Sequence, residues 1–390
     1  MSKELKVIEI PVGPQHPALH EPIQLKIWVY GEEVVDVKVV AGFNHRGVEW
    51  LAERKTWFQN VFMCSRVCGI CNTVHGTTCS QCFEDLGNVE VPPRAKYLRV
   101  LVNELERIHS HMIILAIMAE AIGFDSLFML MMRDRERVMY LKELVTGNRV
   151  LADYVTIGGV RRDVSKETCD KILKYIDFIE ERMKFYKKIW GEDPIVRKRL
   201  VDTGRATASQ ALSHCFVGPM LRGSGVKSDV RRDYPYAAYD EVPFNVITYR
   251  EGDSWARMMV RVDEIFESIN MVRYVIEHLP SGPILPKVVP RKLPAGEGFS
   301  KSEAPRGELV YHAISKGGMK PYRLKIRTPS FTNIHNGAFL IKGAHVADVP
   351  VIFTSFDPCI ACTERVKIID AKTGKVRIMP FNKLSKLKKL

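Results

Sequence analysis

The chain has 390 residues, of which 46% are hydrophobic and 26% are charged, and its formal net charge is +13 at pH 7. This supply of apolar side chains is enough for a large buried core, which excludes an intrinsically disordered chain or a small disulfide-stabilised protein. The length is typical of one large domain or of two to three ordinary ones.

The excess of positive charge suits nucleic acid, an acidic membrane surface or an acidic protein as a partner. The basic residues are dispersed, however, as in Arg161-Arg162 and Arg231-Arg232, and no recognisable nucleic-acid-binding module surrounds them. We therefore predict a solvated surface with some docking faces and no nucleic-acid binding.

No membrane span or secretion signal is predicted. The N-terminal segment SKELKVIEI lacks the apolar core of a signal peptide. The most apolar region, from Met112 to Met132, is interrupted by Glu120, Gly123 and Asp125. It predicts a buried pair of helices, because a membrane span needs ~20 uninterrupted apolar residues. Any membrane association would therefore depend on partner subunits.

Residues 1–50 are predicted to form β structure. Three segments alternate apolar and polar residues, and the Gly-Pro, Glu-Pro and Gly-Glu pairs between them are typical of turns. The segments are LKVIEI, IQLKIWVYG and VVDVKVVAGF.

From Pro92 onward the pattern is helical. In the segment from Pro93 to His111 apolar residues recur at helical spacing, and a proline is typical of the first turn of a helix. Further helical patterns follow at 134–150, 165–190 and 253–279.

After Leu279 proline and glycine become frequent, which predicts a loop or linker of about twenty residues. Strand-like segments return in GELVYHAI, YRLKIRT and ADVPVIFTSF, and 366–379 is predicted to be a hairpin. The pattern predicts an α+β fold in which a long central helical body is flanked by small β regions at two adjacent termini. The predicted regions are 1–60, 61–280 and 281–390.

Two C-x-x-C pairs, Cys68 with Cys71 and Cys359 with Cys362, lie near opposite ends of the chain. Such a turn places two sulfurs on one side of a loop, so two pairs supply four thiolates to one site. Thiolates are soft ligands that suit zinc, an iron–sulfur cluster or a soft transition metal. Structural zinc sites usually draw their pairs from ~15–20 residues apart. The wide separation here predicts a metal at the heart of the fold, where the two β regions meet.

The residues around the pairs narrow this choice, because they resemble in identity and spacing the two signature motifs of the [NiFe] hydrogenase large subunit. The first motif is formed by RGVE at 46–49 and SRVCGIC at 65–71, followed by His75, and the second is FDPCIAC at 356–362. Nine cysteines in a chain without a secretion signal also favour metal or redox chemistry over disulfides.

Further segments resemble one subgroup, the group 4 energy-converting hydrogenases, which are related to the quinone-site subunit of respiratory complex I. That complex I subunit lacks the cysteine pairs, so their presence here favours a hydrogenase. The segments are GPQHPALHEP at 13–22, HRG at 45–47, ELERIHSH at 104–111, TIGGVRRD at 156–163, RGSG at 222–225, DVR at 229–231 and PYAAYD at 235–240.

The resemblance implies that all four cysteines bind nickel and that Cys71 and Cys362 bridge to an iron carrying carbonyl and cyanide ligands. It implies that Glu21 accepts the proton from H2 cleavage, where an ordinary turn carboxylate is the alternative. It also implies that Arg327 donates hydrogen bonds to cyanide, where a surface cation is the alternative. Asp357 would orient that arginine or cap the turn before the second pair.

Several other residues have open roles. His75 is expected to support a cysteine ligand and not to bind nickel itself, and Glu49 is a candidate for a magnesium site or a proton route. Cys169 and Cys215 are expected to be buried thiols. Four histidines are either proton carriers or core residues: His16, His20, His109 and His111. Three further cysteines are small core residues, a second metal site or a redox disulfide: Cys64, Cys79 and Cys82.

The sequence departs from the group 4 pattern at Ser65 and Glu364, where Glu and Asp are frequent, whereas Arg365 fits the pattern. A carboxylate missing at Ser65 is compatible with altered proton traffic, and one branch of the family reduces sulfane sulfur (polysulfides) in place of protons. A non-catalytic docking subunit like that of complex I is the third alternative. Many relatives lose a C-terminal extension after nickel insertion, so this chain either needs no processing or is already trimmed.

The chain has no ferredoxin-like cysteine run of its own. The resemblance therefore implies a small partner subunit with an adjacent iron–sulfur cluster, and complex I-like membrane subunits that pump ions. It places the chain on the cytoplasmic face of the cell membrane as a peripheral subunit.

Overall fold

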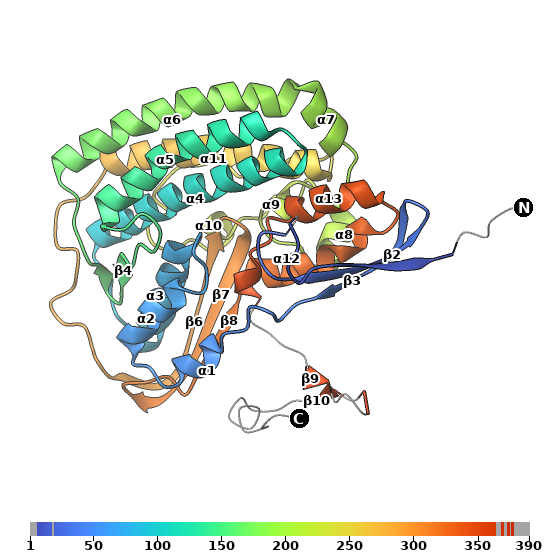
Figure 1. The fold of residues 1–390 in the computed structure, drawn as a ribbon. Helices are drawn as coiled ribbons and strands as arrows, with labels where there is room; N and C mark the ends of the chain where they lie inside the picture. The colour runs from blue at the N-terminus through green and yellow to red at the C-terminus, as the bar shows by residue number, and fades with distance from the viewer. Residues whose placement is uncertain (1–5, 18, 364–367, 370–372, 375, 378–390) are drawn as a thin grey trace, which may run out of the picture.

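The computed structural model describes residues 6–17, 19–363, 368–369, 373–374 and 376–377. A layer of long helices lies on one side of the molecule, a second layer of shorter helices and strands lies beneath it, and the N-terminal sheet extends to one side (Figure 1). This arrangement confirms the predicted α+β fold, which is mostly helical with small sheets.

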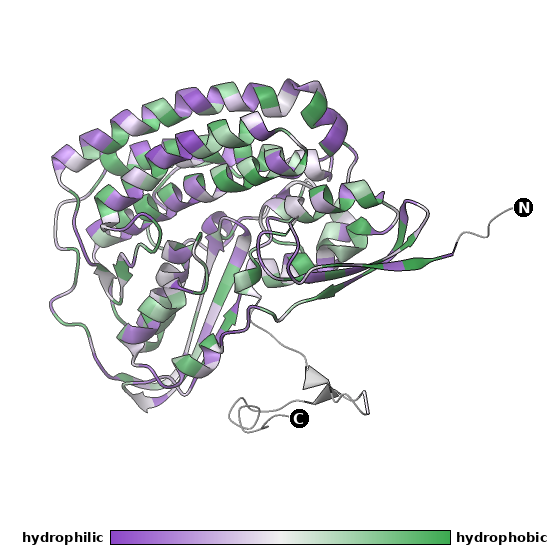
Figure 2. Ribbon diagram, in the orientation of Figure 1, coloured by the Kyte–Doolittle hydropathy of each residue, from purple (hydrophilic) through white to green (hydrophobic). Residues whose placement is uncertain are grey.

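The long helices are α4 (Pro93–Ala121), α5 (Asp125–Thr146), α6 (Lys166–Glu192) and α11 (Ser254–Glu277). Helix α4 packs on α5 and α11, and α6 covers both of these neighbours from outside. Polar and apolar residues alternate along α6, whose inner face alone is buried (Figure 2). The predicted pair of helices is present, because α4 and α5 are joined by a turn at Gly123 with φ 80°. Only α4 is largely buried, however, since Met129 on the first turns of α5 is 66% exposed.

Two helices frame the first cysteine pair. Helix α2 (Trp57–Ser65) begins at a capping box, in which Thr56 and Gln59 satisfy each other's backbone N–H groups. Helix α3 (Asn72–Gly87) follows after a short turn and packs against a three-stranded sheet. Helix α1 (Val48–Ala52) precedes both, so the region predicted as β structure up to residue 60 ends in helices.

The sheets are antiparallel and separate. Strands β1 (Ile8–Val12), β2 (Gln24–Tyr30) and β3 (Glu33–Val40) form the N-terminal sheet. Strands β6 (Leu293–Ala304), β7 (Gly307–Gly318) and β8 (Arg323–Arg327) form the sheet against α3. Two small pairs are β4 (Val155–Thr156) with β5 (Gly159–Val160), and β9 (Ile368–Ile369) with β10 (Val376–Arg377). The last pair lies within the predicted C-terminal hairpin.

Short helices connect these layers. They are α7 (Pro194–Leu200), α8 (Ala208–Ser213), α9 (Pro219–Arg222), α10 (Val230–Asp233), α12 (Pro329–Gly337), η1 (Ala338–Ile341), η2 (Val346–Asp348), α13 (Val349–Ser355) and η3 (Ile360–Cys362). No helix within the described residues is long and apolar enough to cross a membrane.

Three predictions of local structure are corrected. The segment ADVPVIFTSF was predicted as a strand but contains η2 and α13, because α13 is buried against α4 and α11. The proline- and glycine-rich loop is shorter than predicted, because strand β6 begins at Leu293. The cysteines were expected where the two terminal β regions meet, but these regions form separate sheets and the cysteines lie in turns beside α2, α3, α13 and η3.

Candidate metal centre

The two cysteine pairs lie in two turns that face each other. Cys68 and Cys71 lie between α2 and α3, and Cys359 and Cys362 lie in the turn that follows α13. Their exposed fractions are 1%, 2%, 4% and 5%, respectively. The two pairs, which are far apart in the sequence, therefore form one buried cluster in the fold.

The sulfur atoms are close enough to share one metal site. The Sγ of Cys359 lies 3.3 Å from that of Cys68 and 3.1 Å from that of Cys362, and all four cysteines are free thiols. Ligand atoms of Cys68, Cys359 and Cys362 form one compact group, and those of Cys71, His75 and Cys362 form another. Among the described residues these are the groups of three or more Cys, His, Asp or Glu side chains that could hold one ion, and they share a cysteine.

Buried polar groups hold the first turn. The carboxylate of Glu106 on α4 accepts hydrogen bonds from the backbone N–H of Thr73 and of Val74, both at 2.9 Å. These donors are among the unpaired N–H groups at the start of α3, so Glu106 caps the helix that begins beside Cys71. The ammonium of Lys142 lies 3.6 Å from Glu106 and balances its buried charge.

The second turn is held by the start of α12 and by Arg46. The backbone N–H of Cys359 donates to Ser330 at 3.2 Å, and Thr328 donates to the carbonyl of Cys362 at 2.9 Å. The guanidinium of Arg46 donates to the carbonyls of Arg66, Val67 and Ala361 at 2.9–3.0 Å. Arg46 thus joins the two cysteine turns to each other.

The four thiols perturb one another. Hydrogen bonds from Cys359, Cys362 and Cys71 lower the pKa of Cys68 well below its usual value. The hydrogen bonds with Cys359, Cys68 and Cys71, together with burial, raise the pKa of Cys362 well above it. Several thiolates cannot ionise together in such a site unless a cation compensates them.

His75 lies on the α3 side of the cluster. Its Nε2 lies 3.9 Å from the Sγ of Cys362, and its Nδ1 lies 2.7 Å from the hydroxyl of Tyr311. Burial lowers the pKa of His75 to about 4, so the imidazole is neutral at pH 7.

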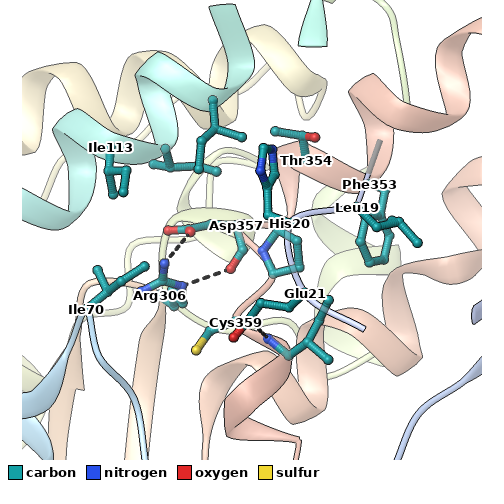
Figure 3. A pocket seen from close by; sticks show the side chains of 14 residues that line it. Leu19, His20, Glu21, Ile70, Ile113, Arg306, Phe353, Thr354, Asp357 and Cys359 are labelled. Atoms are coloured by element: carbon teal, nitrogen blue, oxygen red, sulfur yellow. Dashed lines mark hydrogen bonds and ion pairs between the residues drawn. The ribbon is translucent and has the colours of Figure 1, made fainter. Parts of the chain in front are cut away.

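A narrow cavity of about 80 Å³ opens beside Cys359 (Figure 3). Its walls are mainly apolar, with Ile70, Ile113 and Phe353 among them, and its polar lining includes His20, Glu21 and Arg306. The volume is enough for a small molecule.

Glu21 is anchored on the backbone of the second cysteine turn. One of its carboxylate oxygens accepts hydrogen bonds from the backbone N–H of Ile360 and, at 3.1 Å, of Ala361. The carboxylate therefore borders the cavity next to Cys359 and is held by the backbone of the turn that carries the second cysteine pair (Figure 3).

Arg306, at the turn between β6 and β7, is the arginine beside the cysteines. Its Nη2 lies 2.8 Å from Oδ1 of Asp357, and its Nε donates to the backbone carbonyl of the same residue at 3.0 Å (Figure 3). Asp357 on the other side lies 3.7 Å from Arg261. The charges of Asp357, Cys359 and Cys68 outweigh burial and raise the pKa of Arg306 well above its usual value.

The expectation that Asp357 orients Arg327 is corrected by this geometry. The guanidinium of Arg327 pairs with the carboxylate of Glu308 and donates to its backbone carbonyl, and the side chain is about one-third exposed (32%). Its neighbour Thr328 touches the cysteine turn, so the segment lies at the site while the arginine side chain points elsewhere.

Comparison with known proteins connects this site to two related groups. Residues 121–291 and 288–365 match the family model "Respiratory-chain NADH dehydrogenase, 49 Kd subunit", and residues 46–118 match "Nickel-dependent hydrogenase". The chain is 41% identical to the carbon monoxide-induced hydrogenase of Rhodospirillum rubrum, over 91% of this chain and 99% of the relative. It is 38% identical to the membrane-bound hydrogenase subunit alpha of Pyrococcus furiosus, over 97% of this chain and 92% of the relative.

A solved structure agrees with these relatives. A chain of the membrane-bound sulfane sulfur reductase, an archaeal respiratory membrane complex, superposes with a TM-score of 0.88 and 33% identity, over 94% of this chain and 100% of the other. The chain belongs to the family of group 4 [NiFe] hydrogenase large subunits and complex I 49 kDa subunits. The predicted resemblance is thereby confirmed.

The donor set fits a metal centre of the kind that the [NiFe] hydrogenases in this family carry. Four buried thiols, none in a disulfide, converge on one point, and their mutual repulsion calls for a soft cation. The guanidinium of Arg306 lies close by and adds positive charge.

Several family motifs fold into a buried charge network that supports Arg306. Glu303 lies just before the hairpin turn. Its carboxylate accepts a hydrogen bond from Arg222 at 2.8 Å, and its backbone carbonyl accepts one from Arg107 at 2.7 Å. Further buried members are Glu104, Asp229, Arg231 and Glu264. Their charges fix the end of the β6–β7 hairpin against α4 and α11.

The remaining candidates lie around the centre and not in it. The carboxylate of Glu49 binds Arg323 at 2.9 Å and Lys325 at 3.4 Å, which makes it an anchor for β8. His111 is buried and lies 2.8 Å from Glu264, whereas His20 is half exposed and lies 3.8 Å from Glu120. His109, also buried, lies 3.4 Å from Arg135, and His16 lies in the segment before Glu21.

The position of Ser65 still has a carboxylate beside it. Its hydroxyl donates to Asp153 at 2.7 Å, and Arg66 pairs with the same carboxylate at 2.6 Å. Glu364 and Arg365, the other positions compared with the group 4 pattern, lie outside the described residues.

The extra cysteines divide into two kinds. Cys64, Cys79 and Cys82 are fully buried, as expected of core residues. The expectation of buried thiols is wrong for Cys215, which is exposed, and only partly met by Cys169.

Proposed function

We propose that this chain is the catalytic subunit of a membrane-bound [NiFe] hydrogenase complex that reversibly reduces protons to H2. The observation that carries the proposal is one cluster of four buried thiols, which lies beside a small cavity that Cys359, the anchored carboxylate of Glu21 and the buried guanidinium of Arg306 line. The complex I subunits of the family carry the fold without the cysteines, so retention of all four favours redox chemistry at the site.

Cys68, Cys71, Cys359 and Cys362 would hold the nickel, and Cys71 and Cys362 would also bind the iron. Support for this pairing comes from the second ligand group, in which these two sulfurs lie within 4.8 Å of each other and of His75. When bound, the nickel–iron group with its carbonyl and cyanide ligands supplies the redox chemistry of H2.

Glu21 would take the proton away from the cysteine turn. Its carboxylate is fixed by two backbone donors in the same turn and borders the cavity. A base held at fixed distance from the proton donor is what general base catalysis requires. The half-exposed His20 lines the same cavity and provides the next group toward solvent.

Arg306 takes the role first assigned to Arg327. A buried guanidinium beside the cysteines would donate to the diatomic ligands and stabilise negative charge at the centre. Asp357 orients it through two contacts, at 2.8 and 3.0 Å. Glu49 is retained only as an anchor of β8, because it belongs to neither group of candidate metal ligands.

Electrons would leave through a small iron–sulfur subunit, and complex I-like membrane subunits would hold the complex at the cytoplasmic face of the cell membrane and pump ions. The relatives named as membrane-bound hydrogenase and respiratory membrane complex support this assembly.

Reduction of sulfane sulfur is the second candidate function, and the structural match to a sulfane sulfur reductase favours it. The apolar cavity beside Cys359 is also compatible with a short sulfur chain. Metal content and product separate the alternatives. A hydrogenase contains stoichiometric nickel and iron and evolves H2, a sulfur reductase releases sulfide, and a docking subunit does neither.

The decisive experiment uses the intact complex with a reduced dye as electron donor. We expect nickel and iron in the isolated complex, H2 evolution, and little sulfide from polysulfide. Nickel-free complex that forms sulfide would overturn the proposal.

Glu21→Gln tests the proton route within the same assay. Glutamine retains an oxygen for both backbone donors but cannot ionise. Metal content should stay normal while H2 evolution and proton–deuterium exchange fall together by about 10²-fold. Loss of metal would instead show that Glu21 is a structural turn residue.

A further inference from the structure

A chain of buried polar side chains runs from the metal centre into the sheet behind it. The imidazole of His75 on α3 contacts Cys362 through Nε2 at 3.9 Å and Tyr311 on β7 through Nδ1 at 2.7 Å. His75 and Tyr311 are both 0% exposed, and their rings meet edge to face. Bulk solvent therefore does not reach the imidazole.

The hydroxyl of Tyr311 lies inside a buried cluster. Burial, together with the nearby Cys64 and Cys79, raises the pKa of Tyr311 well above its usual value. Both thiols are 0% exposed and belong to the same buried cluster as Tyr311. Neither belongs to a group of candidate metal ligands among the described residues, and the hydrogen-bond partner of the Tyr311 hydroxyl there is His75.

The direction of the hydrogen bonds follows from counting protons. A metal-bound thiolate at Cys362 can only accept, so the neutral imidazole must present its single N–H at Nε2. Nδ1 then has only a lone pair, and the hydroxyl of Tyr311 must donate to it.

We propose that Tyr311 is a positioning residue of the centre: its hydroxyl holds His75 in the tautomer that donates to the sulfur of Cys362. This inference rests on the proposed nickel centre.

The consequence is electronic. A hydrogen bond to a ligand sulfur withdraws electron density from it, and such bonds set the reduction potentials of metal–thiolate centres. Without Tyr311, His75 can adopt the other tautomer and present a lone pair to Cys362. The sulfur then becomes a stronger donor, which stabilises the oxidised centre and lowers the midpoint potential.

Tyr311→Phe in the intact complex is the test, with metal analysis and a nickel redox titration followed by electron paramagnetic resonance. We expect unchanged nickel and iron and a reduction equilibrium about tenfold less favourable, which is about 59 mV for one electron. The infrared bands of carbonyl and cyanide should shift in the same sense. Tyr154→Phe is the matched control, because this buried tyrosine donates to the carbonyl of Arg162 at 2.7 Å and belongs to a different buried cluster from the four metal-site cysteines.

A double variant separates positioning from packing. Replacement of Tyr311 in a His75→Gln background should add no further shift.

Three outcomes would overturn the inference: a metal-replete Tyr311→Phe complex with the wild-type potential, an undiminished shift in the His75→Gln background, or loss of nickel on removal of the hydroxyl alone. The proposed function is tested separately, with the wild-type complex. If that complex contains nickel but reduces sulfur, the proposed function is wrong and the potential of Tyr311→Phe still tests the inference. If it contains no nickel, both the proposed function and the inference are wrong.

Discussion

Replacing Arg306 by methionine, with Arg327→Met as the matched comparison, distinguishes two candidates for the arginine that acts at the centre. The sequence motif favours Arg327, and the geometry favours Arg306. Methionine removes the charge and every donor while keeping an unbranched apolar side chain of similar length.

The structure predicts different losses of stability for the two substitutions. Arg306 is 3% exposed and makes three contacts, at 2.8 and 3.0 Å to Asp357 and at 3.3 Å to Ser110. Breaking a buried ion pair leaves an uncompensated charge and costs about 3–5 kcal/mol. The pair of Arg327 with Glu308 is about one-third exposed (32% and 26%), so its loss costs at most about 1 kcal/mol.

The assay is H2 evolution by the intact complex, normalised to nickel, together with the temperature of half-inactivation. Arg306→Met should lower turnover by about 10²-fold or more, the loss that follows removal of one preorganised donor. Arg306→Lys keeps the charge but only one contact, so its turnover should lie between that of the wild type and that of Arg306→Met. Arg327→Met should stay within about twofold of the wild type. A larger loss for Arg327→Met than for Arg306→Met would refute the assignment.

Three further changes test the centre and its scaffold. Cys362→Ser replaces a soft ligand by a hard hydroxyl, so nickel should be lost while circular dichroism stays unchanged; full nickel content would refute the ligand assignment. Gly218→Ala places a Cβ 2.4 Å from the Cα of Gly307 at φ 65°, whereas Gly31→Ala has the same φ and open space, so only the former should lower the inactivation temperature strongly. Burial lowers the pKa of His111 to about 4 from 6.5, so the unfolded chain takes up this proton first and stability falls by up to about 3 kcal/mol as pH drops from about 6.5 to 4. His111→Gln should flatten that part of the pH profile of stability, and an unchanged profile would contradict the reasoning.

The cysteine site could be predicted because short sequence motifs contain the residues that determine its chemistry. The C-x-x-C pairs and their flanking residues specify ligand type and spacing locally, and the structure brings both pairs together. The choice of arginine could not be predicted in this way. Arg306 follows the end of a strand, and only the fold shows that the hairpin turn lies against Asp357. No local pattern encodes the direction of that guanidinium.

Two errors of secondary structure also have physical reasons. Helix α13 is rich in β-branched and aromatic residues and is buried on most sides. Its sequence therefore lacks a polar face and resembles that of a buried strand. Its proline near the first turn was the available signal of a helix start. In β6 the glycines mark close packing and not a linker. A Cβ on Gly298 would lie 2.2 Å from the carbonyl of Cys82, because α3 lies directly on this strand.

The polar contacts around the cysteines explain how a site can be built from opposite ends of a chain. Glu21 binds two N–H groups of the second turn, and Arg46 binds one of its carbonyls while holding the first turn through two others. Both residues come from the N-terminal region, so the backbone of the last turn is satisfied by side chains that precede the first cysteine. The free energy of metal binding can then act directly on the docking of this turn, since the ligands converge only when it is in place. The same contacts place the Glu21 carboxylate on the ligand turn itself, so that docking the turn assembles the proposed metal site and the proposed proton acceptor in one step.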